Sequence, residues 1–263
     1  MFPSLTEVGA VLRRGQMTLI AAPPSCAKSL IALTITLKSG VPALYVSADS
    51  DAFDQLTRAV CILAGTDTRT ARRAVLRDDL RAYSEALAAS PVRFCFDGGP
   101  TRETLELEVA AYEEVYGEWP SLVVIDNITN VEDATGVGGE EGLEDLLGYL
   151  HTMARETGAC VIGLHHVTGP YNNGDKPIPR SGIKGQLGRV PEMIWTIHKP
   201  YEDTLRVSPV KVRGASHDPS GETFAELDFD GDHMRIADPR AAAERPAEPD
   251  PEPPAEEAGS IWE

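Results

Sequence analysis

The octet Ala22-Pro23-Pro24-Ser25-Cys26-Ala27-Lys28-Ser29 is the strongest indication of the architecture of this chain. It joins an apolar run, Met17–Ala22, to an amphipathic stretch, Lys28–Lys38, and this pattern predicts a buried strand, a turn and a helix. Its spacing is that of the phosphate-binding loop G-x-x-x-x-G-K-[ST]. In such a loop the backbone N–H groups and the N-terminus of the helix surround the phosphates.

We therefore predict that this loop binds ATP with Mg²⁺. The Lys28 ammonium would reach the β- and γ-phosphates, and the Ser29 hydroxyl would ligate the Mg²⁺. The other nucleotide-binding residues of the loop are Pro24, Ser25, Cys26 and Ala27. Both glycines of the motif are alanine here, at Ala22 and Ala27, and a Cβ costs roughly 1–2 kcal/mol where the backbone must be left-handed. An ordinary strand–turn–helix is the alternative for this octet.

A second apolar run, Leu122–Ile125, ends in the single acid Asp126. A strand of this form downstream of a phosphate-binding loop is typical of a Walker B strand, whose carboxylate holds the Mg²⁺ shell through water. We assign Asp126 to the metal site together with Ser29. A buried strand that ends in Asp is common by itself, so its pairing with the loop carries the assignment.

Strand and helix patterns alternate along most of the chain. Short apolar runs, typical of strands buried on both faces, lie at Met17–Ala22, Ala43–Ser47, Val92–Phe96, Leu122–Ile125 and Cys160–Leu164. Amphipathic stretches predict helices at Lys28–Lys38, Asp51–Ala64, Arg102–Tyr116 and Glu140–Thr157. This alternation predicts an α/β fold with a mostly parallel central sheet flanked by helices. Later strands are expected at Glu192–His198, Leu205–Val212, Glu222–Phe229 and His233–Ile236, as antiparallel strands at the C-terminal edge.

With these motifs, residues 8–236 resemble the RecA-like superfamily of P-loop NTPases, in particular the DnaB-type and plasmid RepA-type hexameric helicases and their phage relatives. Arg14-Gly15-Gln16 resembles the family's lead-in to the loop, and Leu44–Asp49 resembles the second strand, which ends in the catalytic carboxylate. That position is usually Glu and here is Asp49, whose shorter side chain implies a slower enzyme or a small shift of the loop. Asp51 is a competing candidate, and a helix cap by Asp49 is the structural alternative.

The same resemblance implies roles for three further residues. Val161–His166 resembles the strand whose terminal polar residue contacts the γ-phosphate, which implies that His166 is this sensor; a hydrogen-bonded structural histidine is the alternative. Lys211-Val212-Arg213-Gly214 resembles the family's Lys-x-Arg-Gly turn, which presents an arginine finger to the neighbouring subunit's nucleotide. Arg213 is then the catalytic finger, with Lys211 assisting at the nucleotide. A solvated basic strand end is the alternative.

In the resembled family, loops that point into the ring channel hold single-stranded DNA. The matching stretch, Val167–Val190, contains Lys176, Arg180, Lys184 and Arg189, although a surface loop with incidental charges is an alternative. The resemblance implies an ATP-dependent helicase or translocase that assembles as a hexameric ring on single-stranded or forked DNA in phage or plasmid replication. A RecA/RadA-like recombination or strand-annealing ATPase is one alternative. A weakly or non-hydrolysing nucleotide-binding adaptor, favoured by the altered loop and by Asp49, is another.

The charge of the chain limits how it could bind DNA. The formal net charge is −17, of which Asp238–Glu263 contributes −6 through eight acidic and two basic residues. This balance excludes a general basic nucleic-acid surface, so DNA would bind through a local loop. We expect residues 1–236 to form the core and the Pro/Glu-rich residues 237–263 to form a disordered tail, or one that docks on a replication partner through Trp262.

Cysteine usage and hydropathy indicate a cytosolic protein, and the resemblance to plasmid and phage helicases implies the cytoplasm of a bacterium or a phage-infected cell. The four cysteines lie far apart without a Cys-x-x-Cys pair, which favours scattered thiols over zinc or disulfides. No run approaches the roughly 18 apolar residues of a membrane span, and the first residues lack a signal-peptide pattern. We therefore expect no membrane association.

Overall fold

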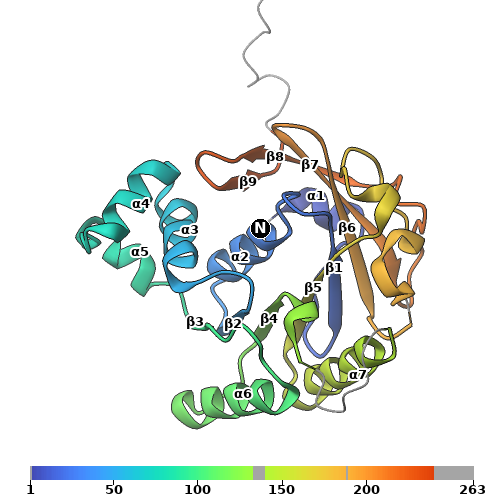
Figure 1. The fold of residues 1–263 in the computed structure, drawn as a ribbon, viewed down its shortest axis with the longest axis horizontal. Coiled ribbons are helices and arrows are strands. Elements are labelled where there is room, and N and C mark those ends of the chain that lie inside the picture. The colour runs from blue at the N-terminus through green and yellow to red at the C-terminus, as the bar shows by residue number, and fades with distance from the viewer. Residues whose placement is uncertain (1, 133–139, 188, 240–263) are drawn as a thin grey trace, which may run out of the picture.

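A mostly parallel sheet lies at the centre of the computed structural model, which describes residues 2–132, 140–187 and 189–239 (Figure 1). The strands are β1 (Met17–Ala21), β2 (Ala43–Ser47), β3 (Val92–Cys95), β4 (Leu122–Asp126), β5 (Cys160–His165), β6 (Met193–Tyr201), β7 (Thr204–Val212), β8 (Ala225–Asp230) and β9 (Arg235–Ala237). Among the described residues they form one sheet in the order β3-β2-β4-β5-β1-β6-β7-β8-β9. Pairing is parallel from β3 to β6 and antiparallel from β6 to β9, so the predicted fold class is confirmed.

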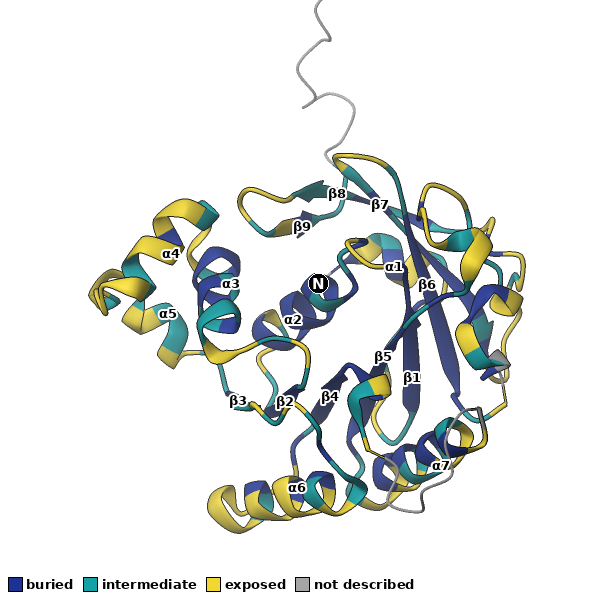
Figure 2. Ribbon diagram, viewed as in Figure 1, coloured by how far each residue is buried: buried dark blue, intermediate teal, exposed yellow. Residues whose placement is uncertain are grey.

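Helices cover both faces of this sheet. They are α1 (Pro3–Glu7), α2 (Lys28–Lys38), α3 (Ala52–Ala64), α4 (Thr68–Leu76), α5 (Ser84–Ala88), α6 (Arg102–Tyr116) and α7 (Glu140–Thr157). Alternate strand residues enter two separate cores: Ile20 and Tyr45 pack with α2 and α3, whereas Leu19 and Val46 pack with α6 and α7. Figure 2 shows the central strands buried and the outer sides of α4 and α6 exposed. Burial on both faces explains why these strands are continuous apolar runs.

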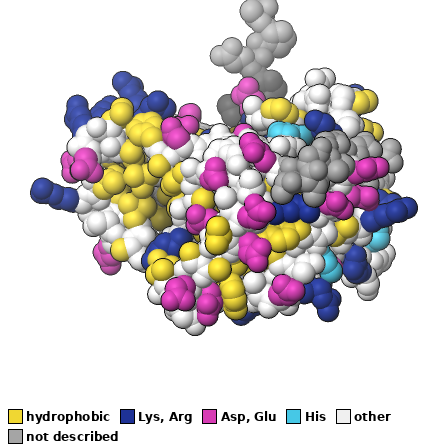
Figure 3. Space-filling view, turned by 60° about the horizontal axis from the view of Figure 1, so that its bottom comes forward, with side chains coloured by type: hydrophobic (Ala, Val, Ile, Leu, Met, Phe, Trp, Pro, Cys, Tyr) yellow, Lys and Arg dark blue, Asp and Glu magenta, His cyan; other side chains and the backbone are white. Residues whose placement is uncertain are grey.

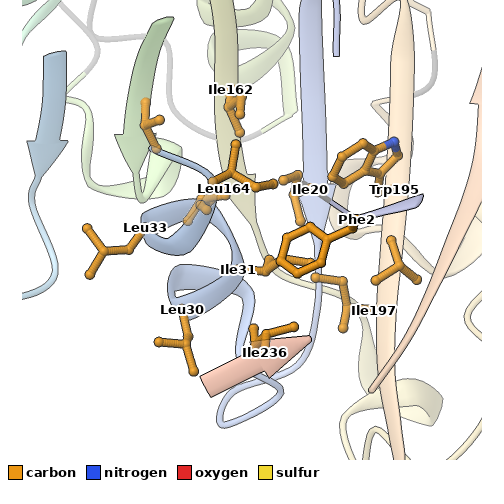
Figure 4. Packing of buried hydrophobic residues seen from close by; sticks show 14 of the residues in the cluster. Phe2, Ile20, Leu30, Ile31, Leu33, Ile162, Leu164, Trp195, Ile197 and Ile236 are labelled. Atoms are coloured by element: carbon orange, nitrogen blue, oxygen red, sulfur yellow. The ribbon is translucent and has the colours of Figure 1, made fainter. Parts of the chain in front are cut away.

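The two ends of the described chain meet beside α2. Phe2 packs with Ile236 in the core on that face of the sheet (Figure 4). Ser4 N donates a hydrogen bond to Asp238 Oδ1 at 2.9 Å. β9 includes Ala237, so the sheet runs one residue past the boundary that we expected at residue 236. The remaining residues of the expected tail, 240–263, lie outside the described residues.

The segment between β2 and β3 departs from the prediction. It contains α4, a 3-10 turn at Arg81–Tyr83 and α5, where the pattern predicts no helix. Ala71 is the buried residue of α4, and it packs against Val60 and Cys61 of α3. The apolar residues Ala71, Ala74 and Val75 do lie on one face of α4, but this stripe is short and two of its three residues are alanine, so its signal is weak.

Candidate nucleotide-binding site

The candidate site lies at the carboxyl ends of four adjacent parallel strands. β1 leads into the loop at residues 22–29, β2 leads to Asp49, β4 ends at Asp126 and β5 ends just before His166. These strands are neighbours in the order β2-β4-β5-β1, so the four groups meet at one edge of the sheet. In open parallel sheets ligands bind at this edge. The sheet therefore brings together residues that are far apart in the sequence.

The loop between β1 and α2 turns through two left-handed residues. Ala27 has φ 56° and ψ 21°, and Ser25 has φ 62°. Ala27 is the N-cap residue of α2, and within the described chain no side chain caps that helix. An uncapped helix N-terminus presents N–H groups that an anion can satisfy. The alanine at position 27 thus carries the left-handed strain that we expected, roughly 1–2 kcal/mol, without losing the turn.

A pocket with a volume of about 350 Å³ opens beside this loop. Its lining includes Pro23, Ser25, Cys26, Ala27, Lys28 and Ser29 from the loop, and Arg58, Phe229 and Met234 from elsewhere. Lys28 is buried, with 8% of its surface exposed, whereas Pro24 is exposed. The pocket therefore contains most of the predicted nucleotide-binding residues, and α3 and the β8–β9 hairpin add three that the motif did not predict.

Asp126 is buried and bonded to the loop. Ser29 Oγ donates to Asp126 Oδ1 at 3.0 Å, and the Tyr45 hydroxyl donates to Asp126 Oδ2 at 2.8 Å. Burial raises the pKa of Asp126, while the two hydrogen bonds and the Lys28 charge lower it. In the described part of the chain, no three His, Cys, Asp or Glu residues form a group that could hold a metal ion. The donors present fit Mg²⁺, which takes one or two protein oxygens and completes its shell with phosphate and water.

Asp49 and Asp51 have different surroundings. Asp51 is the N-cap residue of α3, and its carboxylate accepts a hydrogen bond from Asp54 N at 2.9 Å. Asp49 is exposed, and its N–H donates to the Asp126 carbonyl at 3.2 Å, which ties the end of β2 to the end of β4. Asp51 thus takes the capping role, and Asp49 is the candidate for the catalytic carboxylate.

The two histidines that follow β5 also differ. His165 is fully buried, its Nε2 lies 2.9 Å from the Lys184 carbonyl oxygen, and burial lowers its pKa to about 4. His166 is partly exposed, and its Nε2 lies 2.6 Å from Asn127 Nδ2. Burial lowers the pKa of His166 and the Lys28 charge lowers it further, whereas the Asp49 charge raises it. His166 therefore shares the electrostatic environment of the loop, and Asn127, which the motifs did not predict, orients its ring.

The segment after β5 packs against the loop. Gly174 has φ 71°, and an added Cβ there would lie 3.1 Å from Pro23 Cγ and even closer to Cys26 Sγ. Lys199 N donates to the Gly174 carbonyl at 2.6 Å, and Lys199 Nζ lies 4.6 Å from the centre of the Phe229 ring. These contacts join the loop, the segment after β5 and one wall of the pocket.

Lys211 and Arg213 lie at the opposite end of the sheet. Arg213 N donates to the Glu192 carbonyl at 2.8 Å, and Glu192 N donates to the Met17 carbonyl at 3.0 Å, so both cations lie near the first residue of β1. The loop with Lys28 follows the last residue of this five-residue strand, roughly 16 Å away. The structure therefore does not bring Lys211 and Arg213 to the nucleotide pocket of their own chain.

The cations of the segment Val167–Val190 are exposed, and buried residues of the same segment anchor its backbone to the core. Lys176, Arg180, Lys184 and Arg189 are all exposed. Short 3-10 turns begin at Arg180 and Lys184. Ile178 and Ile183 are buried beneath them, and the Ile178 carbonyl accepts a hydrogen bond from Thr196 Oγ1 at 2.8 Å. Acidic side chains are spread over the face of the molecule seen in Figure 3, which agrees with a local rather than a general cationic surface.

Comparison with known proteins assigns the chain to a family. A family model described as an AAA domain matches residues 6–169, a span that contains the loop, Asp49, Asp126 and His166. The chain belongs to the AAA domain family. The Gene 65 protein of Mycobacterium phage L5 is 51% identical to this AAA domain protein over 245 residues, which cover 90% of the chain and 91% of the relative. The Gene 65 protein of Mycobacterium phage D29 is 50% identical over 229 residues, which cover 84% of the chain and 99% of the relative.

Solved structures resemble this AAA domain protein in fold. The ATPase domain of G40P has a TM-score of 0.76 at 17% identity and covers 90% of this chain and 89% of its own. A DnaB-like replicative helicase, described with its interactions with primase, has a TM-score of 0.76 at 17% identity, and the match covers 90% of this chain and 60% of the helicase chain. The RadB recombinase has a TM-score of 0.58 at 20% identity and covers 89% and 96%. The fold is thus a RecA-like ATPase core resembling those of DnaB-type helicases, as the motifs predicted. No helix in the described ranges is long and apolar enough to cross a membrane.

Proposed function

We propose that this AAA domain protein hydrolyses ATP with Mg²⁺ and uses the free energy to move along single-stranded DNA, as a helicase or translocase of the DnaB/RepA type. The observation that carries the proposal is the convergence of Lys28, Ser29, Asp126, Asp49 and His166 at one edge of the sheet. A phosphate-binding loop beside two carboxylates is the arrangement that phosphoryl transfer needs.

Each residue of this group has a role set by its position. Lys28 and the N–H groups at the start of α2 neutralise the phosphates. Ser29 and Asp126 hold Mg²⁺, which supplies positive charge against the phosphate oxygens when it is bound. Asp49 orients the attacking water and accepts its proton. Its side chain is one methylene shorter than the Glu of the resembled family, so we expect turnover at the slow end for such motors.

The wall of the pocket beyond the loop suits the base and sugar of the nucleotide. Arg58, Phe229 and Met234 line the pocket together with the loop residues. Arg58 Nη1 donates to Ser50 Oγ at 3.2 Å, which fixes the guanidinium relative to β2. A ring face and a planar cation stack on any base, because neither reads the hydrogen-bonding edge. We propose that these three residues contact the base.

The histidine pair supports a link from the nucleotide to DNA. His166 lies at the nucleotide side, and the adjacent His165 contacts the Lys184 carbonyl at 2.9 Å. Lys184 is one of the four exposed cations that we propose to contact the DNA backbone. Lys184 N also donates to the His166 carbonyl at 3.3 Å, so a displacement of His166 on loss of the γ-phosphate would reach the DNA-facing loop directly as well as through His165.

The position of Arg213 favours an assembly of several copies. Because Arg213 and Lys28 lie at opposite ends of β1, Arg213 acts on a nucleotide only when another copy binds that nucleotide. We propose a ring, hexameric as in the resembled family, in which Arg213 and Lys211 reach the site of the next subunit. The ring would work in the cytoplasm of a phage-infected bacterium, as the phage relatives suggest. Docking of the acidic tail on a replication partner is also a proposal, and residues 240–263 lie outside the described residues.

Steady-state ATPase assays with and without single-stranded DNA test the proposal. We expect turnover to rise with DNA and Lys28→Ala to abolish it, because the ammonium neutralises the phosphates in the transition state. Lys38→Ala is the matched control, since Lys38 is the exposed last residue of the same helix. Turnover that survives Lys28→Ala would remove the loop from the mechanism. Electron microscopy with DNA and a non-hydrolysable ATP analogue would show whether a six-fold ring forms.

A nucleotide-binding adaptor is the second candidate, and the left-handed Ala27 favours it because a Cβ stands where the motif has hydrogen. Tight ATP binding without turnover, with or without DNA, would support the adaptor. A forked-duplex unwinding assay separates the helicase from a recombination or annealing ATPase, since the latter would turn over ATP without processive unwinding.

A further inference from the structure

Glu192 is a buried carboxylate just before β6, with 9% of its side chain exposed. Its Oε2 accepts a hydrogen bond from Met17 N at 3.0 Å. Its Oε1 lies 2.9 Å from His151 Nε2 and 3.2 Å from Arg213 Nη1. A carboxylate at this depth needs such partners to offset the loss of water. Glu192 therefore attaches the guanidinium of Arg213 to the start of β1.

The other half of that guanidinium is also bound to its own chain. Arg213 Nη2 donates to the carbonyls of Arg189 at 3.3 Å and Val190 at 3.0 Å. Lys211 Nζ donates to the carbonyls of Arg189 at 2.9 Å and Pro191 at 2.6 Å. Both terminal nitrogens of Arg213 thus point inward, although 53% of its side chain is exposed. A finger must aim its guanidinium at a phosphate of another copy, and contacts that turn both terminal nitrogens towards their own chain oppose that direction.

The inference rests on the proposed function. We infer that Glu192 is a positioning residue that holds Arg213 against its own subunit, and that Arg213 reaches a neighbour's nucleotide only when this hold is released. The carbonyls that accept hydrogen bonds from Arg213 and Lys211 belong to residues 189–191. Arg189 is one of the four cations of the DNA-facing loop, so these bonds connect the restrained finger to that loop. A shift of this segment on DNA binding would withdraw the carbonyl acceptors from Arg213 and Lys211 together.

The hold is tested first on the full chain without nucleotide or DNA. The rate at which phenylglyoxal modifies Arg213, followed by mass spectrometry, reports how well its guanidinium is engaged. We expect Glu192→Gln to raise this rate about two- to fivefold, the range for a partly exposed ion pair. Glutamine keeps an acceptor for Met17 N but removes the charge. The matched control is Glu226→Gln, which breaks the Arg206–Glu226 ion pair (2.9 Å) between β7 and β8 and should leave the Arg213 rate unchanged.

Turnover of the same variants tests the consequence. We expect Glu192→Gln to raise ATPase activity without DNA by a similar factor and to leave the rate at saturating DNA within about twofold, so that the stimulation ratio falls. A merely structural role would lower both rates together. Glu192→Asp keeps the charge but places it one methylene further from Arg213. In this variant the rate of Arg213 modification and the ratio of ATPase rates with and without DNA should therefore lie between those of the wild type and Glu192→Gln.

The two possible failures can be told apart. An Arg213 reactivity that is the same in wild type, Glu192→Gln and Glu192→Asp overturns the inference, and so does a fall in DNA-free turnover of a folded Glu192→Gln chain. Circular dichroism melting checks the folding of each variant. If DNA does not stimulate the wild type, the proposed function fails, and the reactivity difference still decides whether Glu192 holds Arg213.

Discussion

Gly174→Ala tests whether the segment after β5 supports the phosphate-binding loop. At φ 71° an alanine costs roughly 1–2 kcal/mol in backbone strain. The added Cβ would also press on Cys26 Sγ and lie 3.1 Å from Pro23 Cγ, and such overpacking costs roughly 1–3 kcal/mol. We therefore expect the free energy of unfolding to fall by about 2–5 kcal/mol, the sum of the two terms. ATP should also bind more weakly, because the displaced residues belong to the loop.

Urea unfolding followed by circular dichroism measures the first effect, and titration calorimetry with ATP–Mg²⁺ measures the second. Gly40→Ala is the matched control: Gly40 has φ 69°, and no described atom lies within 4 Å of its added Cβ, so it should cost only the backbone strain and leave ATP binding unchanged. Cys26→Ala in the Gly174→Ala background removes the closest contact and should recover part of the excess loss. If Gly174→Ala lowers the free energy of unfolding by no more than Gly40→Ala does, the segment after β5 does not pack tightly against the phosphate-binding loop.

Three further predictions concern single side chains. Tyr45→Phe removes the 2.8 Å hydrogen bond to the buried Asp126 and should lower the free energy of unfolding by about 1–3 kcal/mol in urea titrations; an unchanged midpoint would contradict this. Phe229→Ala should raise the KM for ATP several-fold with little change in kcat, and the opposite pattern in steady-state kinetics would place Phe229 in the chemical step. Burial lowers the pKa of His198 from 6.5 to about 4, and no described group accepts from or donates to its ring nitrogens. Between these two values the unfolded chain binds a proton that the folded chain does not, so stability falls as the pH falls, by roughly 2 kcal/mol from this group between pH 7 and pH 5. His198→Phe keeps a ring against Phe224 and should remove that part of the pH dependence of urea unfolding; an equal slope in both proteins would refute it.

The elements that carry strong local signals could be predicted from the sequence. The predicted bounds of α2 and α6 agree with the structure. α6 has a capping box at Thr101 and a left-handed Gly117 at its end, so its limits are set by neighbouring residues alone. The grouping of Lys28 with Asp126 was also predictable, because parallel strands bring their carboxyl ends to one edge of the sheet.

Contacts between distant segments could not be predicted in the same way. Arg58 and Phe229 line the pocket from α3 and β8, and neither belongs to a motif that marks a nucleotide site. Glu192 precedes an ordinary strand, and its partners come from β1, α7 and the residues after β7. α4 was missed because its apolar face is short, consisting of Ala71, Ala74 and Val75 among charged residues. These features depend on tertiary packing, which a local pattern does not encode.

The strand that separates Lys28 from Arg213 has a consequence for how activity per molecule depends on protein concentration. No rearrangement of side chains brings residues from the two ends of a five-residue strand together, so any acceleration by Arg213 requires an encounter between molecules. That acceleration is lost on dilution below the concentration at which copies associate. In the proposed ring, a cell with few copies would contain folded molecules that turn over ATP only at the slower rate reached without Arg213, and the faster rate would appear once synthesis passed that threshold.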